Sequence, residues 1–288
     1  MKKILVAGAT GYLGSHIVKE LQSGNEPFLA LGRNESKLRK LKLSQDQMVL
    51  GEVTQPHTFR EVFREVDTVI STVGITRQTD GLTYMDVDYQ ANANLLRLAM
   101  EAGVKKFLYV SVINGDKMRH LKIMAAKERF VDELKASGME FTIIRPNGFF
   151  SDMKDFLDMA KKGSIYLFGN GEFKLNPIHG EDLARVIIES LDSNREELEV
   201  GGPDVLTQNE IGVMALDACQ RPKKIVHLPD WTRKVFLSIM RTLTSSKTYG
   251  PVEFFLTMMA QDNIAPRYGI HRLQKFFNEQ VDQIHQHA

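Results

Sequence analysis

The stretch that decides the fold reads Lys3-Ile4-Leu5-Val6-Ala7-Gly8-Ala9-Thr10-Gly11-Tyr12-Leu13-Gly14. An apolar run of strand character breaks into three glycines spaced three apart and leads directly into a helical pattern. A diphosphate needs bare backbone N–H groups at a helix N-terminus and a chain thin enough to approach it closely. The stretch therefore predicts a dinucleotide-binding turn between a first strand and a first helix.

Each glycine has an expected role in this turn. Gly8 supplies the tight turn, Gly11 the close approach to the diphosphate, and Gly14 the close packing of helix on strand. An ordinary flexible turn is the alternative, and the strand before the glycines and the amphipathic helix after them argue against it. The other residues of the turn that we expect to bind the cofactor stand between the glycines: Thr10, Tyr12 and Leu13.

Composition narrows the class of protein. With 288 residues and 43% hydrophobic content, the chain is long enough for one large or two modest domains. A net charge of +1 gives no field that gathers nucleic acid, so nucleic acid is not an expected partner. Apolar runs stop well short of the about 18 residues of a membrane span, so no integral membrane segment is expected. The single cysteine, Cys219, fits a reducing compartment, and the cytoplasm is the expected location.

Strand-like and helix-like segments alternate along the first half of the chain. This rhythm, with short apolar strands rich in β-branched residues, predicts an α/β fold with a Rossmann-type doubly wound parallel sheet. The expected strands after the first cover residues 28–31, 48–50, 68–73, 107–112 and 141–144, and the expected helices after the first cover 35–41, 58–65, 87–102 and 121–136.

Three regions are expected. Residues 1–150 form the NAD(P)-binding Rossmann domain, residues 151–228 a smaller substrate-side region interleaved with the sheet, and residues 229–288 a C-terminal helical cover. Phe, Met and Leu stripes in the last region favour a packed cover over a membrane or partner surface. Breaks in its helices are expected at Gly250-Pro251 and Ala265-Pro266.

No metal site is predicted, because the histidines before the C-terminus are dispersed and lack the spacing of metal ligands. These histidines are His16, His57, His179, His227 and His271.

A series of further motifs, in order along residues 1–229, resembles the atypical and extended short-chain dehydrogenase/reductases, and most of all their NmrA-like and isoflavone-reductase-like branch. The resemblance implies an NAD(P)-dependent oxidoreductase that acts on a small organic substrate. The motifs are Leu31-Gly32-Arg33-Asn34, Gly51-Glu52-Val53-Thr54, Val69-Ile70-Ser71-Thr72-Val73-Gly74, Asn94-Leu95-Leu96, Val110-Ser111-Val112, Ile144-Arg145-Pro146 and His179-Gly180-Glu181-Asp182-Leu183-Ala184.

The end of the second strand indicates which cofactor is preferred. A carboxylate there would repel a 2′-phosphate, whereas this chain has Arg33, with Lys37 one helical turn on. We therefore expect NADP, although Glu35 leaves NAD possible. In the motif Gly51-Glu52-Val53-Thr54, Glu52 replaces the family's usual aspartate, and the backbone of Val53 is the expected contact to the adenine.

The family's usual catalytic pair is a Tyr four residues before a Lys on one helix face. Lys127 matches the Lys and is expected to hold the nicotinamide ribose and supply positive charge, but Ile123 stands where the Tyr would be. Ser111 matches the serine that contacts the substrate oxygen. The proton would come from water, Tyr84 or His120, the last of which is expected on the same helix face as Lys127.

Two other functions stay open, and the missing Tyr favours the first of them. NmrA-like relatives include NAD(P)H-responsive redox sensors and complex-assembly factors, and in such a protein Lys127 and Ser111 would only seat the cofactor. The C-terminal helices would then bind a protein partner. A nucleotide-sugar epimerase or dehydratase is a third reading, disfavoured because that chemistry relies on the Tyr.

Overall fold

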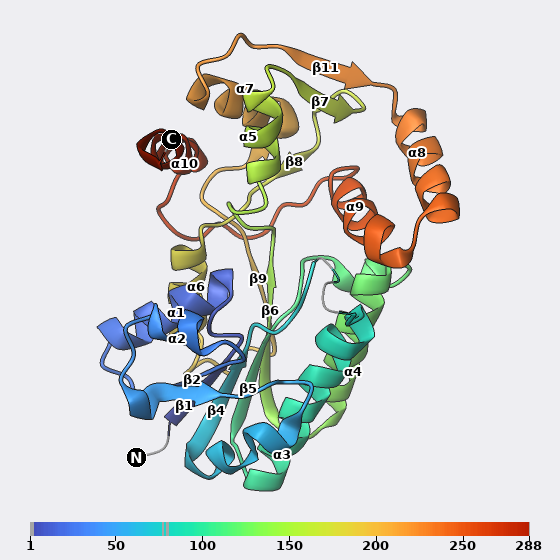
Figure 1. Cartoon of the computed structure of the whole chain (residues 1–288). Coiled ribbons are helices and arrows are strands. Elements are labelled where there is room, and N and C mark those ends of the chain that lie inside the picture. The colour runs from blue at the N-terminus through green and yellow to red at the C-terminus, as the bar shows by residue number, and fades with distance from the viewer. Residues whose placement is uncertain (1–2, 77, 79–80, 288) are drawn as a thin grey trace. The chain divides into compact units, whose positions relative to one another are not determined.

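The computed structural model describes residues 3–76, 78 and 81–287, and the chain forms two compact units (Figure 1). The first unit comprises Met1–Arg145 and Leu183–Leu198, and the second comprises Pro146–Asp182 and Glu199–Ala288. The first unit is thus discontinuous in sequence, because the segment Leu183–Leu198 completes it after the chain has entered the second unit. The boundaries at residues 150 and 228 stay a prediction from the sequence.

The first unit is built on a seven-stranded sheet in the order β3-β2-β1-β4-β5-β6-β9. The pairs from β3 to β6 run parallel. The chain fills the sheet outward from β1 in one direction and then from β4 in the other, which is the doubly wound Rossmann topology predicted from the sequence. The strands are β1 Lys3–Ala7, β2 Phe28–Gly32, β3 Met48–Leu50, β4 Val66–Ser71, β5 Lys106–Val110, β6 Glu140–Pro146 and β9 Glu197–Val200.

Helices cover both faces of this sheet, with α1, α2 and α6 on one side and α3 and α4 on the other (Figure 1). The α-helices are α1 Tyr12–Ser23, α2 Glu35–Arg39, α3 Asn92–Ala102, α4 Lys122–Ala136 and α6 Gly180–Glu189. The short 3-10 helices are η1 Gln45–Gln47, η2 Pro56–Thr58, η3 Arg60–Glu65 and η5 Gly115–Met118.

Two of the expected helices differ in kind from the prediction. The segment predicted over residues 58–65 forms two 3-10 helices, and the one over 87–102 begins as a π-helix, η4 Met85–Ala91, before α3. Beneath α4, the rings of Tyr109 and Phe130 meet edge to face with centroids 4.7 Å apart, and both side chains are fully buried. These contacts hold α4 against strand β5.

The second unit has its own core around Phe150, Phe156 and Phe277. Strand β10 pairs antiparallel with β8, and β11 pairs parallel with β7. Its elements are α5 Lys154–Lys161, β7 Ile165–Phe168, β8 Lys174–Leu175, β10 Leu206–Thr207, α7 Gln208–Ala218, β11 Ile225–Leu228, α8 Asp230–Leu243, α9 Ser246–Met258 and α10 Leu273–His287.

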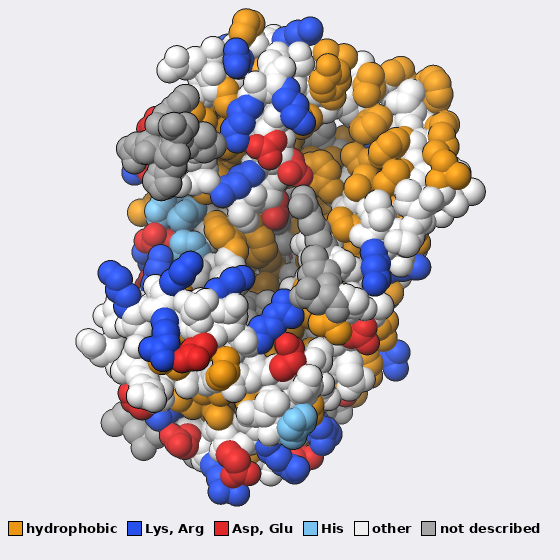
Figure 2. Space-filling model, viewed as in Figure 1, with side chains coloured by type: hydrophobic (Ala, Val, Ile, Leu, Met, Phe, Trp, Pro, Cys, Tyr) orange, Lys and Arg blue, Asp and Glu red, His pale blue; other side chains and the backbone are white. Residues whose placement is uncertain are grey.

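The C-terminal helices differ from the prediction in two ways. Pro251 lies inside α9, so Gly250-Pro251 does not break the helix, whereas Ala265-Pro266 does lie between α9 and α10. On α8 an apolar stripe faces solvent, which is not what a packed cover predicts (Figure 2, upper right). The stripe consists of Trp231, Val235, Phe236, Ile239 and Leu243, with exposed fractions from 42% to 76%. In the part of the chain that the structure describes, no helix is both long and apolar enough to cross a membrane.

Candidate functional site

The turn after β1 leaves no room for side chains at two of its glycines. Gly8 has φ +81°, and a Cβ placed there would lie 2.6 Å from Thr72 Oγ1. A Cβ on Gly14 would lie 2.1 Å from the carbonyl oxygen of Gly8. Gly11 is the N-cap of α1, and its N–H donates to Gly8 O at 2.9 Å. The first turn of α1 is therefore pressed against the end of β1 as a bare backbone cradle, which fits a diphosphate.

Basic side chains lie at the end of β2. Arg33 follows the strand with its side chain 55% exposed, and its guanidinium is 3.9 Å from a carboxylate oxygen of Glu52. Lys37 lies in α2. The carboxylate of Glu35, which left NAD possible, is paired with Arg39 at 2.6 Å. Arg39 thus reduces the negative charge that Glu35 would present to a 2′-phosphate.

The segment expected to meet the adenine is held by an asparagine of α3. Asn94 Nδ2 donates to the carbonyl oxygen of Val53 at 3.3 Å. The side chain of Asn94 is buried, so this contact fixes the backbone of the turn after β3. Asn94 belongs to a motif quoted from the sequence, and the contact gives that motif a physical role.

Lys127 of α4 is buried at the carboxyl edge of the sheet. Its Nζ lies 2.9 Å from Oδ1 of Asp88, whose side chain is fully buried. A Cβ on Gly74, just after β4, would lie 2.8 Å from this Nζ. Burial is the largest single influence and lowers the pKa of Lys127, but Asp88 and Tyr109 together outweigh it and raise the pKa above its ordinary value. Lys127 therefore carries a fixed positive charge at neutral pH.

Sequence reasoning missed Asp88, which comes from the π-helix η4. Asn92 anchors this π-helix to the end of β4: Ser71 Oγ donates to Asn92 Oδ1 at 2.5 Å, and Asn92 Nδ2 donates to the carbonyls of Asp88 at 3.0 Å and Val73 at 3.2 Å. π-Helical turns occur frequently at functional sites. The signal in the sequence was a carboxylate near the start of the helix predicted over residues 87–102.

Ser111 lies after β5, inside a second buried charge network. Its Oγ donates to Glu128 Oε1 at 2.9 Å. The guanidinium of Arg145 binds both oxygens of Glu128, at 2.7 and 3.0 Å, and its Nε donates to Glu197 at 2.7 Å. The network ties α4 to β6 and uses the hydroxyl proton of Ser111. A contact from Ser111 to substrate stays a prediction.

The structure argues against His120 as the proton donor to the substrate and shows what surrounds Tyr84 and Tyr109. His120 is exposed and precedes the first residue of α4, so the expectation that it shares a helix face with Lys127 was wrong. Tyr84 is buried and donates to the carbonyl of Thr76 at 2.8 Å. Tyr109, fully buried, holds its ring 5.6 Å from Lys127 Nζ, and burial raises its pKa to about 12. Such a phenol is a poor proton donor at neutral pH.

Comparisons with known proteins agree with this geometry. A family described as NAD(P)H-binding matches residues 8–194. The chain is 27% identical to the chloroplastic divinyl chlorophyllide a 8-vinyl-reductase of Zea mays, over 96% of this chain and 79% of that protein. It is 29% identical to the photosystem II assembly factor Ycf39 of Guillardia theta, over 66% of this chain and 61% of that protein.

A solved structure described as AtPrR2 with NADP+ and (+)pinoresinol has the same fold. It superposes with a TM-score of 0.74 at 17% sequence identity, over 96% of this chain and 98% of that chain. At this identity the likeness concerns the fold alone.

Two glycines at opposite ends of α1 provide a matched test of the cradle. Gly14→Ala places a Cβ against the carbonyl of Gly8 and should weaken NADP(H) binding at least tenfold, about 1.4 kcal/mol. Gly24→Ala, where the nearest atom is 3.6 Å away and φ is −80°, should leave binding unchanged. Titration calorimetry measures both. Equal affinities in the two variants would show that the close approach at Gly14 does not shape the site.

The phenol of Tyr109 should ionise at a higher pH than an exposed tyrosine does. Because its pKa is raised from 10.0 to about 12, the folded protein holds the proton more tightly than the unfolded chain. The stability it contributes is fully present below pH 10 and is lost as the pH rises towards 12. Tyrosinate absorbance should show a step near pH 12 that Tyr109→Phe removes. An unchanged titration curve above pH 10 in the folded Tyr109→Phe variant would contradict this.

Proposed function

The chain belongs to the NAD(P)H-binding family, and from this premise we propose that it is an NADP(H)-dependent oxidoreductase acting on a small organic substrate. The observation that carries the proposal is the buried, charged Lys127 at the carboxyl edge of the sheet, beside Gly74. In doubly wound folds, ligands bind at this edge where the strand order reverses. The cofactor and the reaction are therefore assigned to the same part of the first unit.

Different residues of this unit would bind the cofactor and stabilise negative charge on the substrate. The glycine turn offers backbone N–H groups to a diphosphate, and Arg33 and Lys37 offer positive charge to a 2′-phosphate. The bound cofactor would supply a hydride. Lys127 would hold the nicotinamide ribose and stabilise negative charge that develops on the substrate, without giving up its own proton. Since Ile123 has no proton to donate, the substrate would be protonated from water.

Removing the charge of Lys127 tests the enzymatic role. In Lys127→Met combined with Asp88→Asn, both members of the buried pair are neutral, so the fold is not burdened with an unpaired charge. NADPH oxidation, followed against a panel of carbonyl, enone and quinone compounds, should fall at least a hundredfold. Lys122→Ala, at the exposed start of the same helix, is the control. Full turnover in the double variant would refute the role of Lys127.

Cofactor choice depends on Arg33. Arg33→Ala should weaken NADPH binding at least tenfold and NADH binding less than twofold, because only NADPH has the 2′-phosphate that a guanidinium binds. Arg64→Ala, an exposed arginine paired with Glu61, should change neither affinity. Equal losses for the two nucleotides would show that Arg33 does not bind the 2′-phosphate.

A second candidate is a non-catalytic NAD(P)H-binding assembly factor or sensor. The exposed apolar stripe of α8 favours it, because contiguous exposed apolar side chains mark interaction surfaces. The Guillardia theta relative, described as an assembly factor, also supports it. Tight NADPH binding without oxidation by any compound, and partner binding that Trp231→Asp abolishes, would favour this function over turnover.

A further inference from the structure

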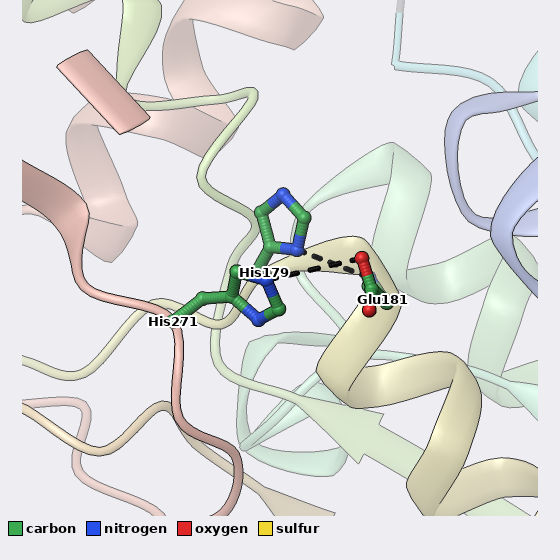
Figure 3. A group of neighbouring side chains, drawn as sticks. All are labelled: His179, Glu181 and His271. Atoms are coloured by element: carbon green, nitrogen blue, oxygen red, sulfur yellow. Dashed lines mark hydrogen bonds and ion pairs between the residues drawn. The ribbon is translucent and has the colours of Figure 1, made fainter. Parts of the chain in front are cut away.

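Two histidines and a glutamate of the second unit converge on one point (Figure 3). His179 precedes α6, Glu181 lies in the first turn of α6, and His271 lies just before α10. Each of the three residues offers one ligand atom, and these atoms lie within 4.8 Å of one another. The distance from His271 Nε2 to Glu181 Oε2 is 3.8 Å. All three residues belong to the second unit.

A buried carboxylate orients one of the imidazoles. Asp182 is fully buried, and its Oδ1 lies 2.9 Å from Nδ1 of His271. Because an ionised carboxylate can only accept hydrogen bonds, Nδ1 donates to Asp182, and the other ring nitrogen, Nε2, is the one that faces Glu181. A metal-binding histidine typically has its other ring nitrogen bound to a carboxylate in this way.

The backbone around Asp182 is shaped to hold this arrangement. Its Oδ2 accepts the N–H groups of Ile270 at 3.0 Å and His271 at 2.9 Å. Gly269 has φ +79°, and a Cβ there would lie 2.2 Å from the same oxygen. Asp182 thus fixes both the position and the tautomer of His271.

The second imidazole is held by aromatic packing. The rings of His179 and His271 stack with centroids 4.3 Å apart, and Phe150 meets the His179 ring edge to face at 5.6 Å. These contacts fix the plane of the His179 ring beside His271.

We propose that His179, Glu181 and His271 bind a divalent transition-metal ion of the zinc type, with Asp182 as the residue that positions His271. Two imidazole nitrogens and one carboxylate oxygen suit zinc, whereas calcium and magnesium take oxygen ligands. Ligands of a tetrahedral zinc ion stand about 3.4 Å apart, so small side-chain movements complete the site. The fourth position is left for water or an external ligand.

The local charge also suits a cation. The N-terminus of α6 has partial positive charge, which the carboxylates of Glu181 and Asp182 in its first turn offset. The nearby guanidinium of Arg272 is paired with Asp204. The bound ion joins the segment before α10 to the start of α6, and so adds stability to the second unit.

Zinc binding by the full chain tests the site. Titration calorimetry with Zn²⁺ alone should show one ion per chain, millimolar Mg²⁺ should not compete, and Co²⁺ should give the visible bands of a tetrahedral ion. His179→Gln and Glu181→Gln should each weaken Zn²⁺ binding at least tenfold. The Glu181 side chain is 46% exposed, so its variant should fold and bind NADPH normally.

Two controls separate this site from incidental binding. His57→Gln removes an exposed histidine elsewhere and should leave Zn²⁺ binding intact. His285 and His287, two apart in the sequence, are replaced together by Gln, and this variant should also keep the ion. Absence of Zn²⁺ binding, or binding lost with His285 and His287 but kept without Glu181, would overturn the proposal.

Discussion

Gly14 packs against the carbonyl of Gly8 at a distance that no side chain tolerates, and this contact sets where α1 begins. The bare first turn of the helix then lies directly beyond β1. On the neighbouring strand, Thr72 Oγ1 donates to Ala7 O at 3.1 Å, which joins the same turn to the end of β4. The cradle and the strand edge that carries Gly74 are thus parts of one rigid feature.

Two adjacent residues of α4, one basic and one acidic, each form a buried ion pair with another element. Lys127 pairs with Asp88 of η4, and Glu128 pairs with Arg145 of β6. Buried charges are costly unless they are paired, and breaking such a pair typically costs 3–5 kcal/mol. The two pairs hold the helix on both sides. They fix Lys127 on α4, four residues after Ile123, which stands at the position of the family's usual tyrosine.

The two units have different chemical character. The first offers backbone N–H groups and fixed positive charge, which suit an anionic nucleotide. The second unit offers imidazoles oriented by a carboxylate, together with an exposed apolar stripe on α8. Both features belong to the unit that does not contain the nucleotide turn. They make metal binding and partner binding testable in the second unit, whichever activity the first unit has.

The sequence alone determined the glycine turn, the strands β1 to β6 and, to within two residues, the bounds of α2 and α4, because spacing and hydrophobic period are local properties. It also identified Lys127 and the absence of the tyrosine. Only the tertiary structure revealed Asp88 as the partner of Lys127 and brought His179 to His271, 92 positions on in the chain. Such pairs join segments distant in sequence, and no local pattern records which buried charge or imidazole will meet another after folding.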